Sequence, residues 1–175
     1  MAIFSTALVA CSLLSNQIVP QPDVALFKSL VGSWKGTCKT WLDPEKDPDE
    51  AAIEGEFTEV LEGKFIRHTY TSTFMKKPRK GEELLAINKV TNKFEITWID
   101  DFHMNYGIMF SEGRPTASGW SVTGKYATGP STPAWSWRTS YDFEDKDTLN
   151  LTSYNISPEG KEDIAIEIVY KRVKK

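Results

Sequence analysis

The stretch Gly32-Ser33-Trp34-Lys35-Gly36 places one tryptophan between two glycines at the head of the first convincing strand. Almost all of the sequence after it shows the two-residue alternation of β-strands, interrupted by turn residues. We therefore interpret Trp34 as the floor of a closed sheet, and alternation places Gly36, Cys38 and Thr40 on the same inward face.

Turn signals divide the rest of the chain into short strands at spacings of roughly 8–12 residues, which is typical of a sandwich or an up-and-down barrel. Apolar residues at helical spacing after Pro22 predict a short helix before the first strand. Over residues 22–175 the sequence thus predicts an all-β domain, a single antiparallel up-and-down barrel of about ten strands with a short N-terminal helix capping one end. The expected strands are 33–42, 52–61, 64–75, 82–90, 93–100, 104–111, 118–126, 135–143, 148–156 and 162–173.

The last strand favours closure of the barrel. Its apolar face, which must be the interior, also carries Arg172. A buried cation without a partner is very costly, so Arg172 needs one. The ring face of Trp34 and nearby carbonyl groups would serve, by cation–π contact and hydrogen bonding. The residues expected to share this inward face are Ile164, Ile166, Ile168, Tyr170 and Arg172.

With Gly-x-Trp-x-Gly in the first strand and an arginine near the end of the last, the chain resembles the calycin superfamily, which includes lipocalins and fatty-acid-binding proteins. More narrowly, it resembles an uncharacterised bacterial calycin-like family, a domain of unknown function, over about Val24 to Arg172. This resemblance implies the barrel fold but brings no settled activity and no assigned site residues. The matching segments are Leu30–Gly36, Leu61–Phe65, Trp98–Met104, Phe110–Gly113, Trp135–Arg138 and Tyr154–Gly160 through Tyr170–Arg172.

Charge argues against nucleic acid as a partner. The 175 residues carry a formal net charge of −3, with both signs mixed along the chain, so no basic face is expected. The basic segment from Lys76 to Gly81 could meet a phosphate, but we interpret it as a solvated hairpin tip.

The richest polar cluster contains Trp98, Asp100, Asp101 and His103. Alternation places Trp98 and Asp100 on an inward face, with Asp100 near the rim and His103 just past the corner. The cluster is consistent with a corner held by side-chain-to-backbone hydrogen bonds, with a ligand site, or with acid–base catalysis by Asp100 and His103. No Ser or Cys nucleophile with an attached base is evident.

Aromatic residues form the second cluster. Trp135, Trp137 and Tyr141 share one strand face, and two large rings would fill or line the lumen if that face is inward. An open pocket and a plug of side chains are both compatible with this pattern. The candidate ligand-binding residues are Tyr70, Trp98, Asp100, His103, Trp135, Trp137 and Tyr170.

The sequence predicts no cofactor and no metal. Haem is disfavoured because the only histidines are His68 and His103, and neither lies on the last strand, where the haem-binding relatives carry their ligand. Two histidines and the distant Cys11 and Cys38 do not make a zinc ligand set either.

Residues 1–21 form an apolar N-terminal segment followed by a polar linker. The apolar run is too short to span a bilayer, which needs about 20 residues. It suits a signal peptide, and Leu8-Val9-Ala10-Cys11 resembles a lipoprotein cleavage site, although no Lys or Arg precedes it. An arm packed on the barrel is the alternative, so the cell envelope and the cytoplasm both stay open.

Three functions fit these observations. The first, which we prefer, is a binding or carrier barrel for a small, largely apolar ligand. The second is an enzyme that acts on a small molecule with Asp100 and His103 at the rim. The third is a non-catalytic structural or interaction protein with a filled barrel, for which a homodimer is possible.

Overall fold

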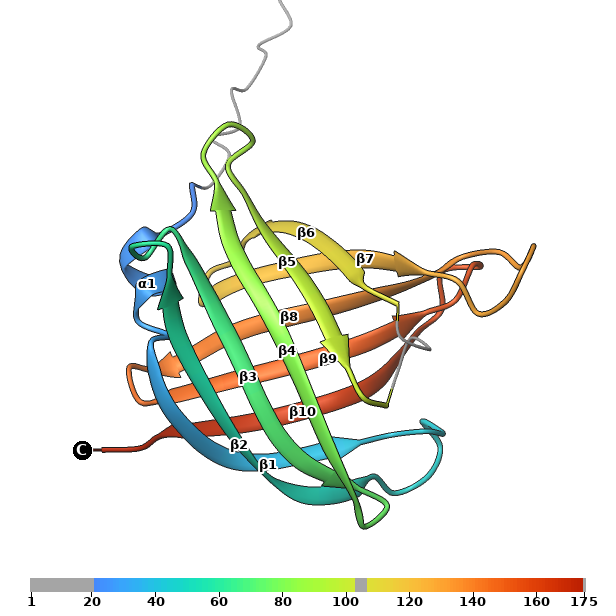
Figure 1. Cartoon of the computed structure of the whole chain (residues 1–175). Helices are drawn as coiled ribbons and strands as arrows, with labels where there is room; N and C mark the ends of the chain where they lie inside the picture. Colours follow the sequence, from blue (N-terminus) through green and yellow to red (C-terminus); the bar gives the residue numbers. More distant parts are fainter. Residues whose placement is uncertain (1–20, 103–106, 175) are drawn as a thin grey trace, which may run out of the picture.

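The computed structural model describes residues 21–102 and 107–174. Ten antiparallel strands and one short helix form a closed barrel in which each strand pairs with its sequence neighbours and β1 pairs with β10 (Figure 1). The predicted fold class is confirmed. The elements are α1 Val24–Lys28, β1 Gly32–Thr40, β2 Asp49–Val60, β3 Phe65–Phe74, β4 Lys77–Asn88, β5 Lys93–Asp100, β6 Met109–Pro115, β7 Gly119–Tyr126, β8 Trp135–Asp145, β9 Thr148–Ile156 and β10 Glu162–Arg172.

Helix α1 closes one end of the barrel. Asp23 caps it by accepting a hydrogen bond from the backbone N–H of Leu26 at 3.0 Å, which satisfies one of the free amides of the first turn. Phe27 is buried, and its ring centroid lies 6.0 Å from those of both Phe94 and Trp120. The helix therefore buries its apolar side in the end of the core, as the apolar spacing predicts.

The seam between β1 and β10 is organised by Trp34 and Arg172, which lie opposite each other in the strand register. The guanidinium carbon of Arg172 lies 4.1 Å from the centroid of the Trp34 ring. Arg172 also donates hydrogen bonds to the carbonyl oxygens of Val31 at 2.9 Å and Ser29 at 2.5 Å. Trp34 Nε1–H donates to the carbonyl oxygen of Leu30 at 2.8 Å. The first strand, the last strand and the chain after α1 are thus joined at one point.

The basic segment differs from the prediction. β4 begins at Lys77, and Arg79 points into the barrel with only 4% of its surface exposed. The turn between β3 and β4 is limited to Met75 and Lys76, both with positive φ. The interpretation of residues 76–81 as a solvated hairpin tip was therefore wrong for Arg79, because a buried carboxylate, described below, receives it, whereas Lys76, Lys77, Pro78 and Lys80 are exposed.

Strand boundaries and register also differ from the prediction. β6 spans Met109–Pro115 rather than 104–111, and residues 103–106 lie outside the described part of the chain. In β10 the register with β9 shifts between Ile164 and Ile166, so Ala165 and Ile166 are both buried. Such a bulge breaks the two-residue alternation, and Ile164 leaves the face it was predicted to share.

No helix in the described ranges has the length and apolar character that a bilayer crossing requires. Cys11 and residues 1–20 lie outside those ranges, so the lipoprotein and arm hypotheses stay predictions.

Candidate functional site

A chain of polar side chains crosses the lumen from β3 to β8. His68, which is 1% exposed, places Nδ1 at 2.7 Å from Oε2 of Glu83. The other carboxylate oxygen of Glu83 accepts a hydrogen bond from the Tyr141 hydroxyl at 2.9 Å. On its far side His68 Nε2 lies 3.3 Å from the Tyr170 hydroxyl, and its ring stacks on Phe57 at 3.9 Å. Every polar group of this chain thus has a partner, as buried polar groups require.

A second polar group lies toward the end of β5. Arg79 Nη2 donates to Oδ2 of Asp100 at 3.3 Å, and the Asp100 side chain is fully buried. The guanidinium carbon lies 5.7 Å from the centroid of the Tyr70 ring, and the Tyr70 hydroxyl accepts a hydrogen bond from Trp98 Nε1 at 3.0 Å. Within the described residues, Arg79 Nε is buried and has no hydrogen-bond partner. A buried donor without a hydrogen-bond partner costs about 1–3 kcal/mol of stability, so an acceptor placed beside Arg79 Nε would be favourable.

The lumen itself is nearly filled. Its cavity measures about 50 Å³, and the polar groups Arg79, His68 and Glu83 share the wall with apolar side chains. A space of about 10–15 Å³ measured in this way holds one water molecule, so this cavity admits a group of a few heavy atoms rather than the body of a ring-containing ligand. The aromatic pattern was compatible with an open pocket and with a plug of side chains, and the structure shows a largely plugged lumen.

A larger pocket of about 360 Å³ opens at the mouth, at the end of the barrel opposite α1. Trp98, Met109, Trp137 and Ile166 line both this pocket and the lumen, so the two spaces adjoin at these side chains. The Trp98 and Trp137 rings stack between them, with centroids 5.6 Å apart. The remaining described lining of the mouth is Thr40, Trp41, Leu42, Phe102, Tyr126, Ala127, Thr128, Asn155 and Ala165.

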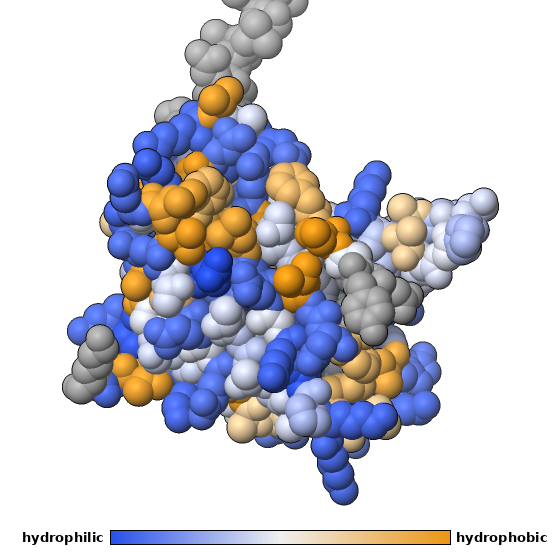
Figure 2. All heavy atoms as spheres, viewed as in Figure 1, coloured by the Kyte–Doolittle hydropathy of each residue, from blue (hydrophilic) through white to orange (hydrophobic). Residues whose placement is uncertain are grey.

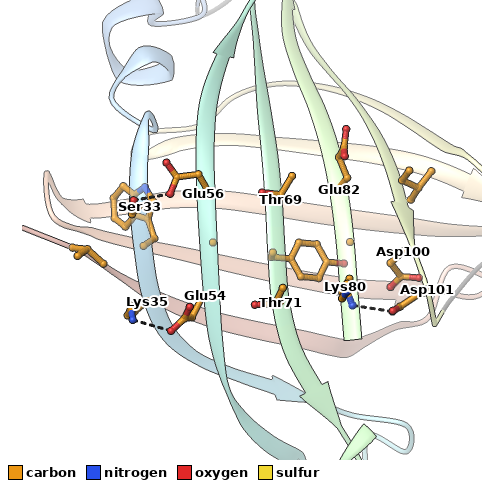
Figure 3. Close-up of a pocket in the computed structure, with 16 residues that line it drawn as sticks. Ser33, Lys35, Glu54, Glu56, Thr69, Thr71, Lys80, Glu82, Asp100 and Asp101 are labelled. Atoms are coloured by element: carbon orange, nitrogen blue, oxygen red, sulfur yellow. Dashed lines mark hydrogen bonds and ion pairs between the residues drawn. The ribbon is translucent and has the colours of Figure 1, made fainter. Parts of the chain in front are cut away.

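A still larger hollow, about 870 Å³, is a groove on the outer face of β1–β5. Figure 3 shows side chains from these strands around it, and its polar groups bind each other: Lys35 pairs with Glu54 at 2.8 Å and Ser33 donates to Glu56 at 2.6 Å. The surface over these strands mixes hydrophilic and hydrophobic residues (Figure 2). The groove is wide and open, whereas small-molecule sites usually enclose most of the ligand, so the mouth pocket is the better candidate.

The structure brings some of the predicted ligand residues together and separates others. Tyr70, Trp98 and Trp137 line the lumen, and the last two also line the mouth. Tyr170 is fully buried and Trp135 is half-buried at the start of β8, and neither is among the described residues that line the lumen or the mouth.

The predicted pair of Asp100 and His103 is only half described. Asp100 faces inward, as alternation predicts, and binds Arg79. His103 lies outside the described residues, so catalysis or ligand binding by this pair stays a prediction.

Sequence reasoning missed His68, Glu83 and Arg79. Two of them had a usable signal: His68 alternates with Ile66 and Tyr70, and Glu83 alternates with the buried Leu85. Charge concealed the pattern, because charged residues are rarely fully buried unless paired. The three residues have complementary charges, since two are bases and one is an acid. They also lie on adjacent strands, in phase with the core residues, and this combination indicates a buried network.

The polar groups of the lumen do not resemble a metal centre. Within the described ranges no group of three or more His, Cys, Asp or Glu side chains is arranged to hold a metal ion. Both ring nitrogens of His68 already contact hydrogen-bonding groups, which leaves neither available as a ligand without rearrangement. The expectation of no haem stays a prediction.

Alkaline pH should unfold the barrel steeply. Burial raises the pKa of Tyr70, Tyr141 and Tyr170 above the ordinary value of 10.0. Above pH 10.0 each phenol keeps its proton in the folded chain but loses it in the unfolded chain. The stability that burial of the neutral phenols contributes is therefore present below pH 10.0 and is lost as pH rises above that value. The free energy of unfolding should fall by up to about 4 kcal/mol per pH unit there.

Absorbance at 295 nm and circular dichroism, followed together against pH, test this expectation. The three phenols should ionise in one step that coincides with loss of the sheet signal. Gradual ionisation of all tyrosines while the sheet signal persists would contradict their burial.

Comparison with known proteins supports the fold and identifies a family. No curated protein matches the sequence. The crystal structure of Rv2717c from M. tuberculosis is similar, with a TM-score of 0.65 and 16% identity over 86% of this chain and 97% of that chain, a likeness that concerns the fold alone. The family model described as "Protein of unknown function (DUF1579)" matches residues 19–172. Since this match spans most of the sequence, the chain belongs to the DUF1579 family.

Proposed function

We propose that this barrel binds a small, largely apolar molecule in the mouth pocket. The observation that carries the proposal is the composition of that pocket: about 360 Å³ lined by indole, phenyl and aliphatic side chains with a few polar groups among them. Sites for small molecules usually have this character, a concave apolar wall with a small number of polar groups that fix orientation.

The polar groups of the mouth are suited to orienting a ligand rather than to catalysing a reaction. The Tyr126 hydroxyl donates to Asn155 Oδ1 at 2.7 Å, and Thr40 and Thr128 add two hydroxyl groups. The pocket wall includes Trp41, Trp98 and Trp137, whose large, rigid rings provide contact area at little cost in conformational entropy. A flat or aliphatic molecule of one or two rings matches this volume and surface.

A neutral fluorescent probe tests the proposal. N-phenyl-1-naphthylamine should bind with a Kd of about 10–100 µM, with increased emission and energy transfer from the tryptophans. Leu42→Asp should weaken binding at least about fivefold, because Leu42 lines the mouth and the change removes apolar contact and adds a charge there.

Leu61→Asp is the matched control for this measurement. Leu42 and Leu61 are 70% and 66% exposed, so neither change should unfold the barrel, and Leu61 lies in the turn between β2 and β3, outside the described lining of the mouth. Equal probe affinity in the two variants would place the probe elsewhere and contradict the mouth site. Absence of probe binding by the unmodified protein would contradict the binding function itself.

A further inference from the structure

Arg79, which lines the lumen cavity, carries a buried donor, Nε–H, that has no hydrogen-bond partner among the described residues. Two buried side-chain atoms in the described part of the chain lack a partner, Arg79 Nε and Trp120 Nε1. Trp120 packs among stacked rings, with Phe94 at 4.6 Å and Tyr141 at 5.2 Å, and it lines neither the lumen nor the mouth as described. Arg79 lines the lumen cavity and is 4% exposed. A hydrogen-bond acceptor in that cavity would satisfy it.

The position of Arg79 connects this donor to the mouth. Arg79 binds Asp100, which lies two residues beyond Trp98 on β5, and Trp98 lines both the lumen and the mouth. The lumen cavity of about 50 Å³ has room for a group of a few heavy atoms. A ligand whose body occupies the mouth could therefore place one small substituent in the lumen, beside the guanidinium.

The charges around the cavity decide what that substituent can be. Arg79 supplies one positive charge, and the carboxylates of Asp100 and Glu83 supply two negative charges. The remaining basic group described there, His68, adds one positive charge or none. In either state the described network has no uncompensated positive charge. An anionic substituent would bring a further negative charge into a buried site, which is unfavourable without a counter-charge.

We propose that the ligand is an uncharged molecule with a carbonyl-type acceptor, and that this acceptor receives the Nε–H of Arg79 while the apolar body fills the mouth. The proposal rests on the proposed binding function and narrows it to a class: neutral aromatic or aliphatic ketones, aldehydes, amides or esters, as opposed to carboxylic acids. Arg79 then acts as a specificity-determining residue, because a site with an unpaired polar group discriminates strongly against analogues that cannot bind it.

Three probes with the same body test this class: 2-acetylnaphthalene, 2-ethylnaphthalene and 2-naphthoate, each titrated against the whole protein. The acetyl compound should bind about tenfold more tightly than the ethyl compound and than naphthoate, in keeping with one hydrogen bond from a charged donor. Hydrophobicity alone would favour the ethyl compound, so it cannot produce this order. The infrared carbonyl band of the bound acetyl compound should move to lower wavenumber.

Arg79→Lys is the informative variant, since it keeps the charge that Asp100 needs and removes the Nε–H. It should abolish most of the acetyl advantage and the carbonyl shift, while affinity for 2-ethylnaphthalene stays within about twofold. Arg67→Lys is the control, because Arg67 pairs with Glu82 at 3.1 Å on the outer face of the same hairpin and should leave all three affinities unchanged. If Arg79→Lys does not fold, the three-probe series and the infrared band of the unmodified protein still decide.

The outcomes separate the inference from the function on which it rests. Equal affinity for the acetyl and ethyl compounds, with both weakened by Leu42→Asp, would overturn the acceptor site and leave the mouth site standing. Tighter binding of naphthoate would also overturn it, since the lumen would then accept an anion. Failure of all three probes to bind would contradict the binding function and the inference together.

Discussion

Replacing Arg172 with methionine is expected to lower the free energy of unfolding by about 3 kcal/mol, measured by urea denaturation. The change removes the cation from the Trp34 ring at 4.1 Å and the donors to the carbonyl oxygens of Ser29, Val31 and Lys146. These part-buried carbonyl oxygens lose a charged hydrogen-bond donor. Each hydrogen bond to a charged group contributes about 1.5–3 kcal/mol to stability, although the contributions do not add fully. The effect should be large because one side chain joins β10 to the start of β1 and to the turn after β8.

Arg138→Met provides the control for this prediction. Arg138 also lies over an aromatic ring, that of Tyr154 at 4.4 Å, and pairs with Glu162 at 2.5 Å. Its side chain is 29% exposed, against 22% for Arg172, so exposure is similar. Arg138 on β8 reaches Tyr154 on the paired strand β9 and Glu162 on β10, away from the seam between β1 and β10, and an ion pair of this kind contributes at most about 1 kcal/mol. Equal losses in the two variants would show that the seam contributes nothing special to stability.

Gly36→Ala is expected to destabilise the protein by about 3 kcal/mol or more, or to prevent folding. A Cβ at this position would lie 1.9 Å from the carbonyl oxygen of Val169 on β10, and a backbone atom in a paired strand cannot yield as a flexible side chain can. The added methyl group therefore has to push β1 and β10 apart at the seam, and the cost of overpacking is typically 1–3 kcal/mol, occasionally more. Yield of folded protein and the urea midpoint measure it.

Gly129→Ala separates this steric cost from the general effect of replacing glycine. The nearest atom to a Cβ at Gly129 is 3.5 Å away, in Thr132, so the new methyl group has room. The variant should be as stable as the unmodified protein, or more stable by about 0.4–1 kcal/mol because the unfolded chain loses freedom. A Gly36→Ala protein as stable as Gly129→Ala would contradict the close approach of the two strands.

The sequence allowed the fold to be predicted because its strongest signals act over short distances. Two-residue alternation identified the strands, and the requirement that Arg172 have a partner led to Trp34, although the two lie at opposite ends of the barrel sequence. Alternation also placed Trp98 and Asp100 inside correctly. These inferences need only the geometry of a strand and the cost of a buried charge.

The candidate site was harder to predict, for a physical reason. Whether Arg79 is solvated or buried depends on the carboxylate of Asp100, which is 21 residues away and reaches it only when β4 and β5 pair. The bulge at Ala165 likewise depends on how β10 fits its neighbour β9. The volumes of the lumen and the mouth depend on many side-chain conformations at once, so alternation could indicate their lining but not their size.

Closure of the barrel also has a consequence for synthesis of the chain. Of the ten strands β1 is made first and β10 last, and Arg172, which lies opposite Trp34 in their pairing, is the last residue of β10. Until β10 leaves the ribosome, β1 and β9 expose unpaired backbone groups to which other nascent chains can add. Truncation before β10 should therefore yield a product that needs chaperones to stay soluble, because the last strand to be made is the one that protects the first.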